Sequence, residues 1–407
     1  MRVTKKAFIG KSIAICCLIL LVVFMCLLKT DTSISEWWTR NIARPIIWLG
    51  GHITGIFPFS FFELFIILSV IGILAWILAW IVYSCVLISR RNFPRLLSLF
   101  MSVVIAVLSV VGVYNASASF GYNRAELDLY GYEGVMDFED AERTVLHFVE
   151  EVNALGESME RDEEGLTVCP YTVRELNDLL IKEYEKLNGD YFGYYTPAAK
   201  GILNKTIMSE LGILGVFFAP FGEPNYNPDE NENGLPLTIA HEMAHAHGIM
   251  RENEADAVAL YICINSDDDY IRYCAYIDCF STMVDILSYY SSGKKYFGEL
   301  SYMVAASEKV KADINDSQQP VSSYGIISKI GNWMNDLYLT LMGRDGTNDY
   351  SNLPDVIYPD PGPVIVPDPG TGSVEPIQPP EIIINSYSLV QNLVISYCIE
   401  TFELQTE

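Results

Sequence analysis

Three long stretches of this 407-residue chain contain no Asp, Glu, Lys or Arg. They are residues 12–28, 64–89 and 96–114, and each can supply the roughly 20 apolar residues that a membrane-spanning helix needs. A channel or transporter usually needs polar or charged groups along its path, but no acidic or basic residue lies inside a stretch, and Glu63 lies only at the end of one. The three stretches are therefore predicted to be an anchor, with a transporter or channel component as the alternative.

A cleaved signal peptide is the alternative interpretation of residues 12–28. No small-x-small cleavage site follows this stretch, and Lys29, Thr30 and Asp31 come directly after it. A first membrane span is the favoured interpretation, because charged residues so close to the apolar run do not suit a cleavage region.

Basic residues are scarce in the rest of the chain. Residues 119–407 hold 16 Lys/Arg against 48 Asp/Glu, whereas residues 1–118 hold 10 against 3. An acidic surface repels phosphates, so no nucleic-acid partner is expected. An apolar, weakly basic front followed by an acidic back indicates a three-helix transmembrane anchor over residues 1–118 and a water-exposed domain after it.

The chain also lacks any C-x-x-C pair. Four of its nine cysteines lie in the apolar stretches, and the other five are an odd number. Neither a cysteine zinc site nor a full disulfide framework is therefore indicated, although one or two disulfides outside the cell stay open. The five are Cys169, Cys263, Cys274, Cys279 and Cys398.

The basic residues predict the orientation of the anchor. Lys and Arg gather in residues 2–11 and in the turn 90–95, and such segments stay in the cytoplasm. Three spans then place everything after about residue 118 outside the cytoplasm, together with the loop 29–57. That loop carries three tryptophans that suit a position along the membrane surface: Trp37, Trp38 and Trp48.

The acidic half is predicted to be mostly helical. Its second predicted helix opens with a capping box, Thr172 and Glu175. A short β-rich run at 212–218 predicts a strand, and residues 224–234 predict a polar loop. Apolar spacing and caps predict helices over residues 137–155, 172–187, 251–265 and 268–290.

Composition divides this half further. Pro, Gly and Asp dominate residues 351–381, which are predicted to be a linker or insertion without a core. Residues 382–407 return to an apolar pattern typical of a helix. The expected organisation is therefore one folded domain over residues 119–350, a linker, and a C-terminal helix.

A histidine-rich segment carries the clearest chemical signal. Residues 238–248 read T-I-A-H-E-M-A-H-A-H-G, with a proline where the helix would begin and a glycine where it would end. On a helix His241 and His245 share a face, so both imidazoles can hold one zinc ion. Glu242 can reach a water on that zinc, take its proton and later pass it to the leaving amine. The zinc lowers the pKa of the water and polarises the scissile carbonyl.

A catalytic zinc needs a third protein ligand and an open fourth position. Glu252 lies seven residues after His245, across a glycine turn, and an antiparallel return would point it back at the metal. Asp256 lies four residues farther on the same face and can accept a hydrogen bond from a ligating histidine. Glu254 is the rival third ligand, less favoured than Glu252.

An H-E-x-x-H pattern also arises by chance. Here, however, three of the five histidines fall within seven residues on one expected helix. His247 is two residues from His245, on another face, and is interpreted as a bystander. His147 and His52 are interpreted as surface or core residues.

Several runs resemble a family of bacterial three-span membrane proteins, the domain-of-unknown-function 3810 family. They are G-I-L-G-V-F-F-A-P-F-G-E-P-N-Y-N at 212–227, L-P-L-T-I-A-H-E-M-A-H at 235–245 and E-N-E-A at 252–255. Shorter runs that also fit are F-P-F-S at 57–60, N-D-L-Y-L at 335–339 and S-Y-S at 386–388. The resemblance implies a relation to zinc metallopeptidases.

The sequence departs from the family pattern at three places. The family commonly has Asn where Asp256 stands and Gln where His247 stands, and the Pro-rich stretch resembles an insertion. With Asp at position 256, residues 252–256 resemble the corresponding segment of the gluzincins, whose third ligand is the Glu of a Glu-x-x-x-Asp pattern. That likeness implies Glu252 as the ligand and Asp256 as the residue that orients a histidine.

Zincins in general pair an extended substrate with a strand beside the active-site helix. The resemblance implies that Gly215, Val216, Phe217 and Phe218 form this strand here. A Tyr or His often steadies the oxyanion, and the sequence leaves three candidates open. They are Tyr226, Tyr289 and Tyr290.

The expected fold is a three-helix membrane anchor followed by a mostly α (α+β) zincin-like domain with a small sheet. The expected protein is a multi-pass membrane metallopeptidase that uses Zn2+ to hydrolyse extracytoplasmic peptides or proteins. A non-catalytic zinc-containing membrane protein, acting as a binding or sensor module, is the alternative. A self-inhibited form, with residues 119–200 over the cleft, also stays open.

Overall fold

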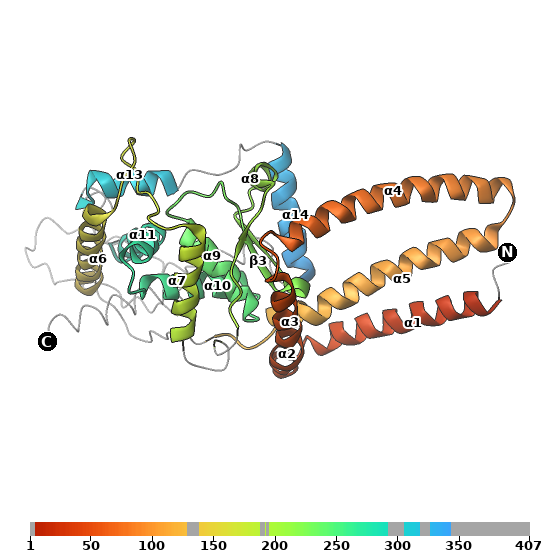
Figure 1. Cartoon of the computed structure of the whole chain (residues 1–407). Coiled ribbons are helices and arrows are strands. Elements are labelled where there is room, and N and C mark those ends of the chain that lie inside the picture. Colours follow the sequence, from red (N-terminus) through yellow and green to blue (C-terminus); the bar gives the residue numbers. More distant parts are fainter. Residues whose placement is uncertain are drawn as a thin grey trace, which may run out of the picture.

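Three long apolar helices form one end of the molecule (Figure 1). The computed structural model describes residues 5–127, 138–187, 192, 195–291, 305–317 and 326–342. Within these, α1 (Lys5–Leu28), α4 (Phe61–Ser89) and α5 (Phe93–Ser117) are long and apolar enough to cross a membrane. Almost none of their residues is buried inside the protein, as expected of helices that face lipid. The three predicted spans are therefore confirmed as span-capable helices.

The chain between the first two spans is helical as well. It forms α2 (Thr32–Trp38), the short π-helix η1 (Thr39–Ala43) and α3 (Arg44–Thr54). Trp38 stacks on Phe120 at 4.4 Å and donates a hydrogen bond to the Ala116 carbonyl at 2.9 Å. Trp37 and Trp48 remain exposed. The segment is thus tied to the end of α5, while two of its three tryptophans face outward.

Two buried carboxylates join α4 to the other half of the molecule. Glu223 caps the start of α4, where it accepts hydrogen bonds from the Phe62 amide at 2.9 Å and the Ser60 hydroxyl at 3.2 Å. Glu63, in the first turn of α4, accepts from the amides of Leu203 and Asn204 at 2.8 Å each. Each carboxylate thereby satisfies amides at the start of a helix, where no carbonyl is available.

A small sheet lies next to this junction. Its strands are β1 (Lys200–Gly201), β2 (Gly215–Phe218) and β3 (Glu223–Tyr226), in the order β1-β3-β2. β2 is antiparallel to β3, and β1 is parallel to it. The predicted strand at 212–218 is present in its second half. The predicted loop 224–234 is wrong at its start, because residues 224–226 belong to β3, where all three pair with β2 and the last two also pair with β1.

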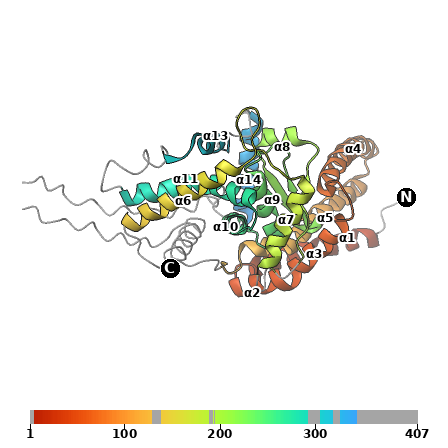
Figure 2. The same ribbon diagram turned by 60° about the vertical axis from the view of Figure 1, so that its left-hand side comes forward.

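Helices surround the sheet and make up most of this half. The helices predicted over residues 137–155, 172–187, 251–265 and 268–290 are present, and the capping box of Thr172 and Glu175 opens α7. Figure 2 shows α6 and α11 running side by side away from the sheet. The remaining described elements are η2 (Ser119–Tyr122), α6 (Phe138–Ser158), α7 (Val173–Lys186), α8 (Lys205–Leu211), η3 (Ala219–Phe221), α9 (Leu235–Ala246), α10 (Glu252–Ile264), α11 (Asp269–Ser291), α13 (Glu308–Ser317) and α14 (Ile326–Met342).

The core of this domain is continuous around α9, α10 and α11. Ile239, Met243, Val258 and Ile271 are fully buried in it, together with apolar residues of α6 and α7. Helix α9 is therefore apolar on one side and carries the histidines on the other, which fixes its rotation relative to the core.

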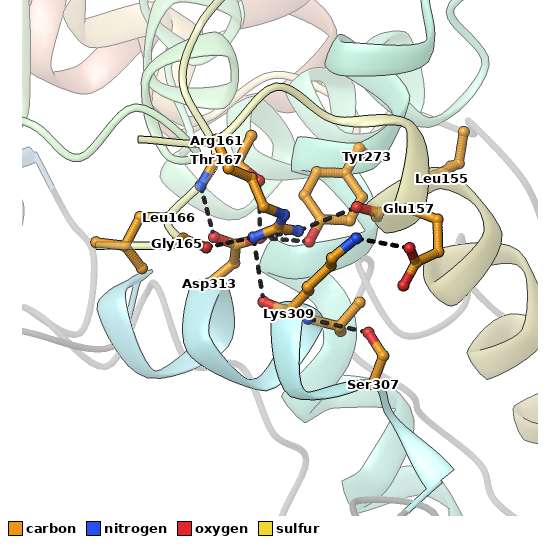
Figure 3. Close-up of polar contacts among 12 residues, drawn as sticks. Leu155, Glu157, Arg161, Gly165, Leu166, Thr167, Tyr273, Ser307, Lys309 and Asp313 are labelled. Carbon is orange, nitrogen blue, oxygen red and sulfur yellow. Dashed lines mark hydrogen bonds and ion pairs between the residues drawn. The ribbon is translucent and has the colours of Figure 1, made fainter. Parts of the chain in front are cut away.

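A buried carboxylate ties three segments together at the far end of the domain (Figure 3). Asp313 of α13 accepts hydrogen bonds from the Thr167 amide at 2.9 Å, the Thr167 hydroxyl at 2.8 Å and the Tyr273 hydroxyl at 2.5 Å. The Arg161 guanidinium pairs with it at 3.1 Å. This cluster links α13, α11 and the turn after α6.

The linker over residues 351–381, the C-terminal helix over 382–407 and Cys398 lie outside the described residues. In the described part of the chain all eight cysteines are free. The disulfides that the sequence left open are therefore not found among these eight.

Candidate metal centre

The segment between α9 and α10 brings the histidine motif against the next helix. Pro236 lies in the first turn of α9, and the helix ends at Ala246. Gly248 has φ +87, a conformation that an L side chain would strain. The chain then reverses, and α10 packs along α9. The motif helix and its antiparallel return are thus arranged as the residue pattern predicts.

Three donors converge between these helices. His241, His245 and Glu252 each offer a ligand atom, and all three atoms lie within 4.8 Å of one another. Glu252 Oε2 is 3.2 Å from His241 Nε2 and 3.6 Å from His245 Nε2. Two imidazole nitrogens and one carboxylate oxygen form a donor set that suits a catalytic zinc ion.

The opposite nitrogen of each ring is held by the protein. His245 Nδ1 donates to the Ile249 carbonyl at 2.6 Å, and His241 Nδ1 is 2.7 Å from Asp256 Oδ1. A carbonyl only accepts, so the hydrogen of neutral His245 is on Nδ1. Its Nε2 lone pair then faces the Glu252 carboxylate, and two acceptors repel unless a cation lies between them. The residues present therefore fit a bound metal ion.

Charge dominates over burial at these donors. Burial lowers the pKa of His241, but Asp256 and Glu252 outweigh it and hold that pKa well above its usual value. The pKa of His245 is raised in the same way, mainly by Glu252 against the effect of burial. Burial favours the neutral form of Glu252, but the two imidazoles outweigh it and hold its pKa well below its usual range. The site thus attracts positive charge to the space between the three side chains.

Glu242 lies beside the donors with one oxygen left over. The residue is 5 % exposed, and its Oε2 has no hydrogen-bond partner in the described part of the chain. Burial raises the pKa of Glu242 to about 7, although the nearby imidazoles act in the opposite direction. Gly215 makes room for this carboxyl, since a Cβ there would lie 2.7 Å from Glu242 Cγ.

Glu254 points away from the three donors. It is fully buried and pairs with Arg124 at 2.5 Å, and it also accepts from the Leu127 amide at 2.8 Å. Arg251 is a second cation near it, at 3.6 Å. The structure therefore brings Glu252, and not its rival Glu254, to the histidines. Nothing in the local pattern pointed to Arg124, which reaches Glu254 from 130 residues away.

Strand β2 separates the donors from the membrane helices. Phe217 faces His245, with ring centroids 5.9 Å apart, whereas Phe218 packs on Phe62 and Phe65 of α4. In the described residues β2 is an edge strand, because only β3 pairs with it. The strand predicted to pair with substrate is thus next to the donors and has one free edge.

Of the three tyrosines proposed for the oxyanion, only Tyr226 has its side chain in the described part of the chain. The hydroxyl of Tyr226 lies near Gly201, 3.0 Å from where a Cβ would be. Tyr289 and Tyr290 belong to the last turns of α11, where the side chains lie outside the described part. In the described residues no contact joins Tyr226 to the histidines.

The remaining histidines are not part of the group. His247 is fully buried, stacks on Tyr184 and hydrogen-bonds with Thr196 at 2.9 Å. His52 is exposed on α3, and His147 is half-buried on α6. These placements agree with the bystander, surface and core roles that the sequence suggested.

Tyr338 of α14 is a polar residue near the donors that sequence reasoning did not select. Its hydroxyl hydrogen-bonds with that of Tyr114 in α5 and lies 2.7 Å from the hydroxyl of Tyr122. Burial raises the pKa of Tyr338 to about 12, and the charges of Glu252 and Glu242 add to that effect. Its run N-D-L-Y-L was noticed only as a family match, since the fold alone brings it near residues 242 and 252.

Comparison with known proteins shows the family of this chain but supplies no related structure. A sequence model of a family described as "Protein of unknown function (DUF3810)" matches residues 38–358. No curated protein and no solved structure matches the chain. The matched range includes α4, α5, the sheet, α9, α10 and α14. The chain therefore belongs to the DUF3810 family.

Proposed function

We propose that this protein is a membrane-anchored, zinc-dependent metallopeptidase that hydrolyses peptide bonds. One observation carries the proposal. Two imidazoles and a carboxylate converge on one point, and the next carboxylate along the helix, Glu242, has a buried oxygen without a partner. A purely structural zinc site needs no such base, and leaving a carboxylate oxygen unpaired is costly without a use.

His241, His245 and Glu252 would hold the zinc. When bound, zinc would polarise a scissile carbonyl and lower the pKa of a water molecule. Asp256 and the Ile249 carbonyl keep each Nδ1 occupied, so that each Nε2 is presented to the metal. Glu242 acts as general base and then as acid, which suits a carboxyl whose pKa is raised by burial to about 7.

The surroundings supply two further roles. The free edge of β2 would align an extended peptide by backbone hydrogen bonds, which are largely indifferent to side chains. Tyr338, close to both Glu252 and Glu242 and held by two other tyrosine hydroxyls, is the candidate donor to the oxyanion. It takes the place of Tyr226, Tyr289 and Tyr290 in this proposal.

The location follows from the basic residues and the spans. With residues 2–11 and 90–95 in the cytoplasm, the domain that contains α9 and α10 is extracytoplasmic. Its substrates would then be peptides or proteins at the outer face of the cell membrane. A cytoplasm-specific reporter fused after Glu407 should be silent, and a signal from it would reverse this orientation.

The proposal is tested by separating zinc binding from hydrolysis. Full-length protein in detergent should contain about one zinc per chain, and His245→Ala should lose it. Glu242→Gln should keep the zinc and lose hydrolysis of a peptide library by ~10²–10⁴-fold. Asn253→Gln, next to Glu252 but not among the three donors, is the matched control and should keep both.

Two results would overturn the proposal. A folded wild-type protein without zinc would remove the metal, and hydrolysis that survives Glu242→Gln would remove the mechanism. Zinc retained in every variant except His245→Ala, with no hydrolysis by wild type, would favour the non-catalytic zinc-containing module.

A further inference from the structure

Helix α14 presents three different faces along its length. Ser328, Gly331, Leu339 and Met342 are buried against the domain, and a Cβ at Gly331 would lie 3.0 Å from the Leu211 carbonyl carbon at the end of α8. A second face is polar and exposed: Lys329, Asn332, Asp336 and Thr340.

The third face is apolar and exposed. It consists of Ile327, Ile330, Trp333, Met334 and Leu337, whose exposed fractions lie between 42 and 62 %. These positions follow the helical period and form one stripe. Leu203 and Ile207 at the neighbouring α8 are exposed as well. A stripe of this kind on a water-facing helix is unusual unless something covers it.

The level of α14 relative to the spans is fixed by two contacts. Tyr338 hydrogen-bonds with Tyr114, three residues before the end of α5. Glu63, in the first turn of α4, binds the amides of Leu203 and Asn204 at the start of α8. Both helices of the α8–α14 pair are therefore attached where the spans end.

The apolar stripe is on the side of α14 that faces the spans. Met334 lies one turn before Tyr338 on the same side, and Tyr338 reaches α5. In Figures 1 and 2, α14 runs across the direction of the spans, at the end where they join the rest of the molecule. The stripe is thus continuous with the lipid-facing surface of the spanning helices.

We infer that α14, with the exposed residues of α8, lies in the plane of the membrane surface, its apolar stripe in the boundary between lipid headgroups and acyl chains. A helix with one apolar face, one polar face and a bulky tryptophan is typical of this position. The occupant of the stripe is the same bilayer that the spans cross.

The acidic charge of the domain disfavours anionic lipids around α14. Residues 119–407 carry a large excess of acidic side chains, so anionic headgroups would be repelled. The stripe itself is apolar and does not need charge. Zwitterionic lipid is therefore sufficient, and docking should not depend on ionic strength.

The experiment places full-length protein in phosphatidylcholine vesicles, with and without bromine on the upper part of the acyl chains. Subtracting the emission of Trp333→Phe from that of wild type isolates Trp333 from the other tryptophans. This difference emission should be largely lost in brominated lipid and be insensitive to aqueous iodide.

The matched control moves the indole by one position. In the double variant Trp333→Phe, Asn332→Trp the indole is on the polar face, so its emission should resist brominated lipid and be quenched by iodide. If this variant does not fold, Lys329→Trp in the Trp333→Phe background puts an indole on the same face.

Two outcomes would overturn the inference. Quenching of Trp333 by iodide and not by brominated lipid would place the stripe in water. Resistance to both quenchers would mean that protein covers it, either residues 343–407 or a second copy of the chain. Neither readout depends on zinc or hydrolysis, so the inference stands or falls separately from the proposed function.

Discussion

Two of the buried groups of carboxylate and partner side chains in the domain are satisfied to different degrees. Asp313 is fully buried and accepts from an amide, two hydroxyls and a guanidinium, so both of its oxygens are occupied (Figure 3). At the candidate metal centre, Glu252 faces two imidazole nitrogens, and Glu242 keeps a buried oxygen without a partner.

The difference separates a carboxylate that stabilises the fold from a group that we propose binds a metal ion. A carboxylate with four protein donors has no capacity left and stabilises the folded chain. A carboxylate opposite lone pairs is stabilised only when a proton or metal ion lies between. Burial alone does not distinguish the two groups; the partners of their carboxylate oxygens do.

The largest expected effect is on stability, at Asp313. Asp313→Ala would leave the buried Tyr273 hydroxyl without its acceptor and the Arg161 guanidinium without its ion-pair partner. This should lower the free energy of unfolding by about 3–5 kcal/mol. Zinc content of the folded fraction should be unchanged. Asn315→Ala, exposed on the same helix, is the control and should stay within about 0.5 kcal/mol of wild type in a denaturant titration.

At Glu252 the opposite result is expected, a large effect on zinc binding and a small effect on stability. Glu252→Gln should weaken zinc binding by more than the ~10–100-fold that follows changes behind a ligand, because it alters the ligand itself. Without metal, the variant and the wild type should have similar free energies of unfolding. Competition with a fluorescent chelator measures the zinc affinity. A large loss of stability in the metal-free variant would show that Glu252, like Asp313, stabilises the fold.

The next effect is a pH dependence of zinc binding. The pKa values of His241 and His245 are raised by the facing carboxylates, so protons hold the rings until metal displaces them. As pH falls through these values, zinc affinity should fall by about tenfold per pH unit for each proton displaced. Chelator competition at a series of pH values measures this slope, and a flat profile would mean that the rings bind metal without releasing protons.

The smallest effect is expected at Asp256. Asp256→Asn keeps an oxygen that can accept from His241 Nδ1 but removes the charge, so zinc affinity should fall about tenfold, at the low end for such groups. Asp256→Ala should cost more. Equal affinities for both variants would show that Asp256 does not orient His241.

Much of the site could be predicted from local pattern. The four-residue spacing of His241 and His245, the turn at Gly248 and the position of Glu252 all lie within one helix–turn–helix segment. The three spans could be predicted equally well, because an uncharged apolar run of this length is typical of a membrane-spanning helix. Such features depend on helical period and on the special conformation of glycine, both of which are local.

The rest depends on contacts between distant segments. Glu254 could not be separated from Glu252 without Arg124, and Tyr338 is near the donors only because α14 crosses the end of α5. Strand β3 was mistaken for a loop because its Pro224 and Asn225 disfavour strands. Pairing with β2, and at Asn225 with β1 as well, overrides that preference.

The reciprocal clamps of Glu63 and Glu223 have a mechanical consequence. Each carboxylate binds backbone amides of the opposite segment. The domain is therefore held rigidly against the start of α4 and does not reorient freely relative to the spans. In a bilayer, the distance of His241, His245 and Glu252 from the lipid surface is therefore fixed. Whatever it meets must come to that height, and lateral diffusion in two dimensions then governs the encounter.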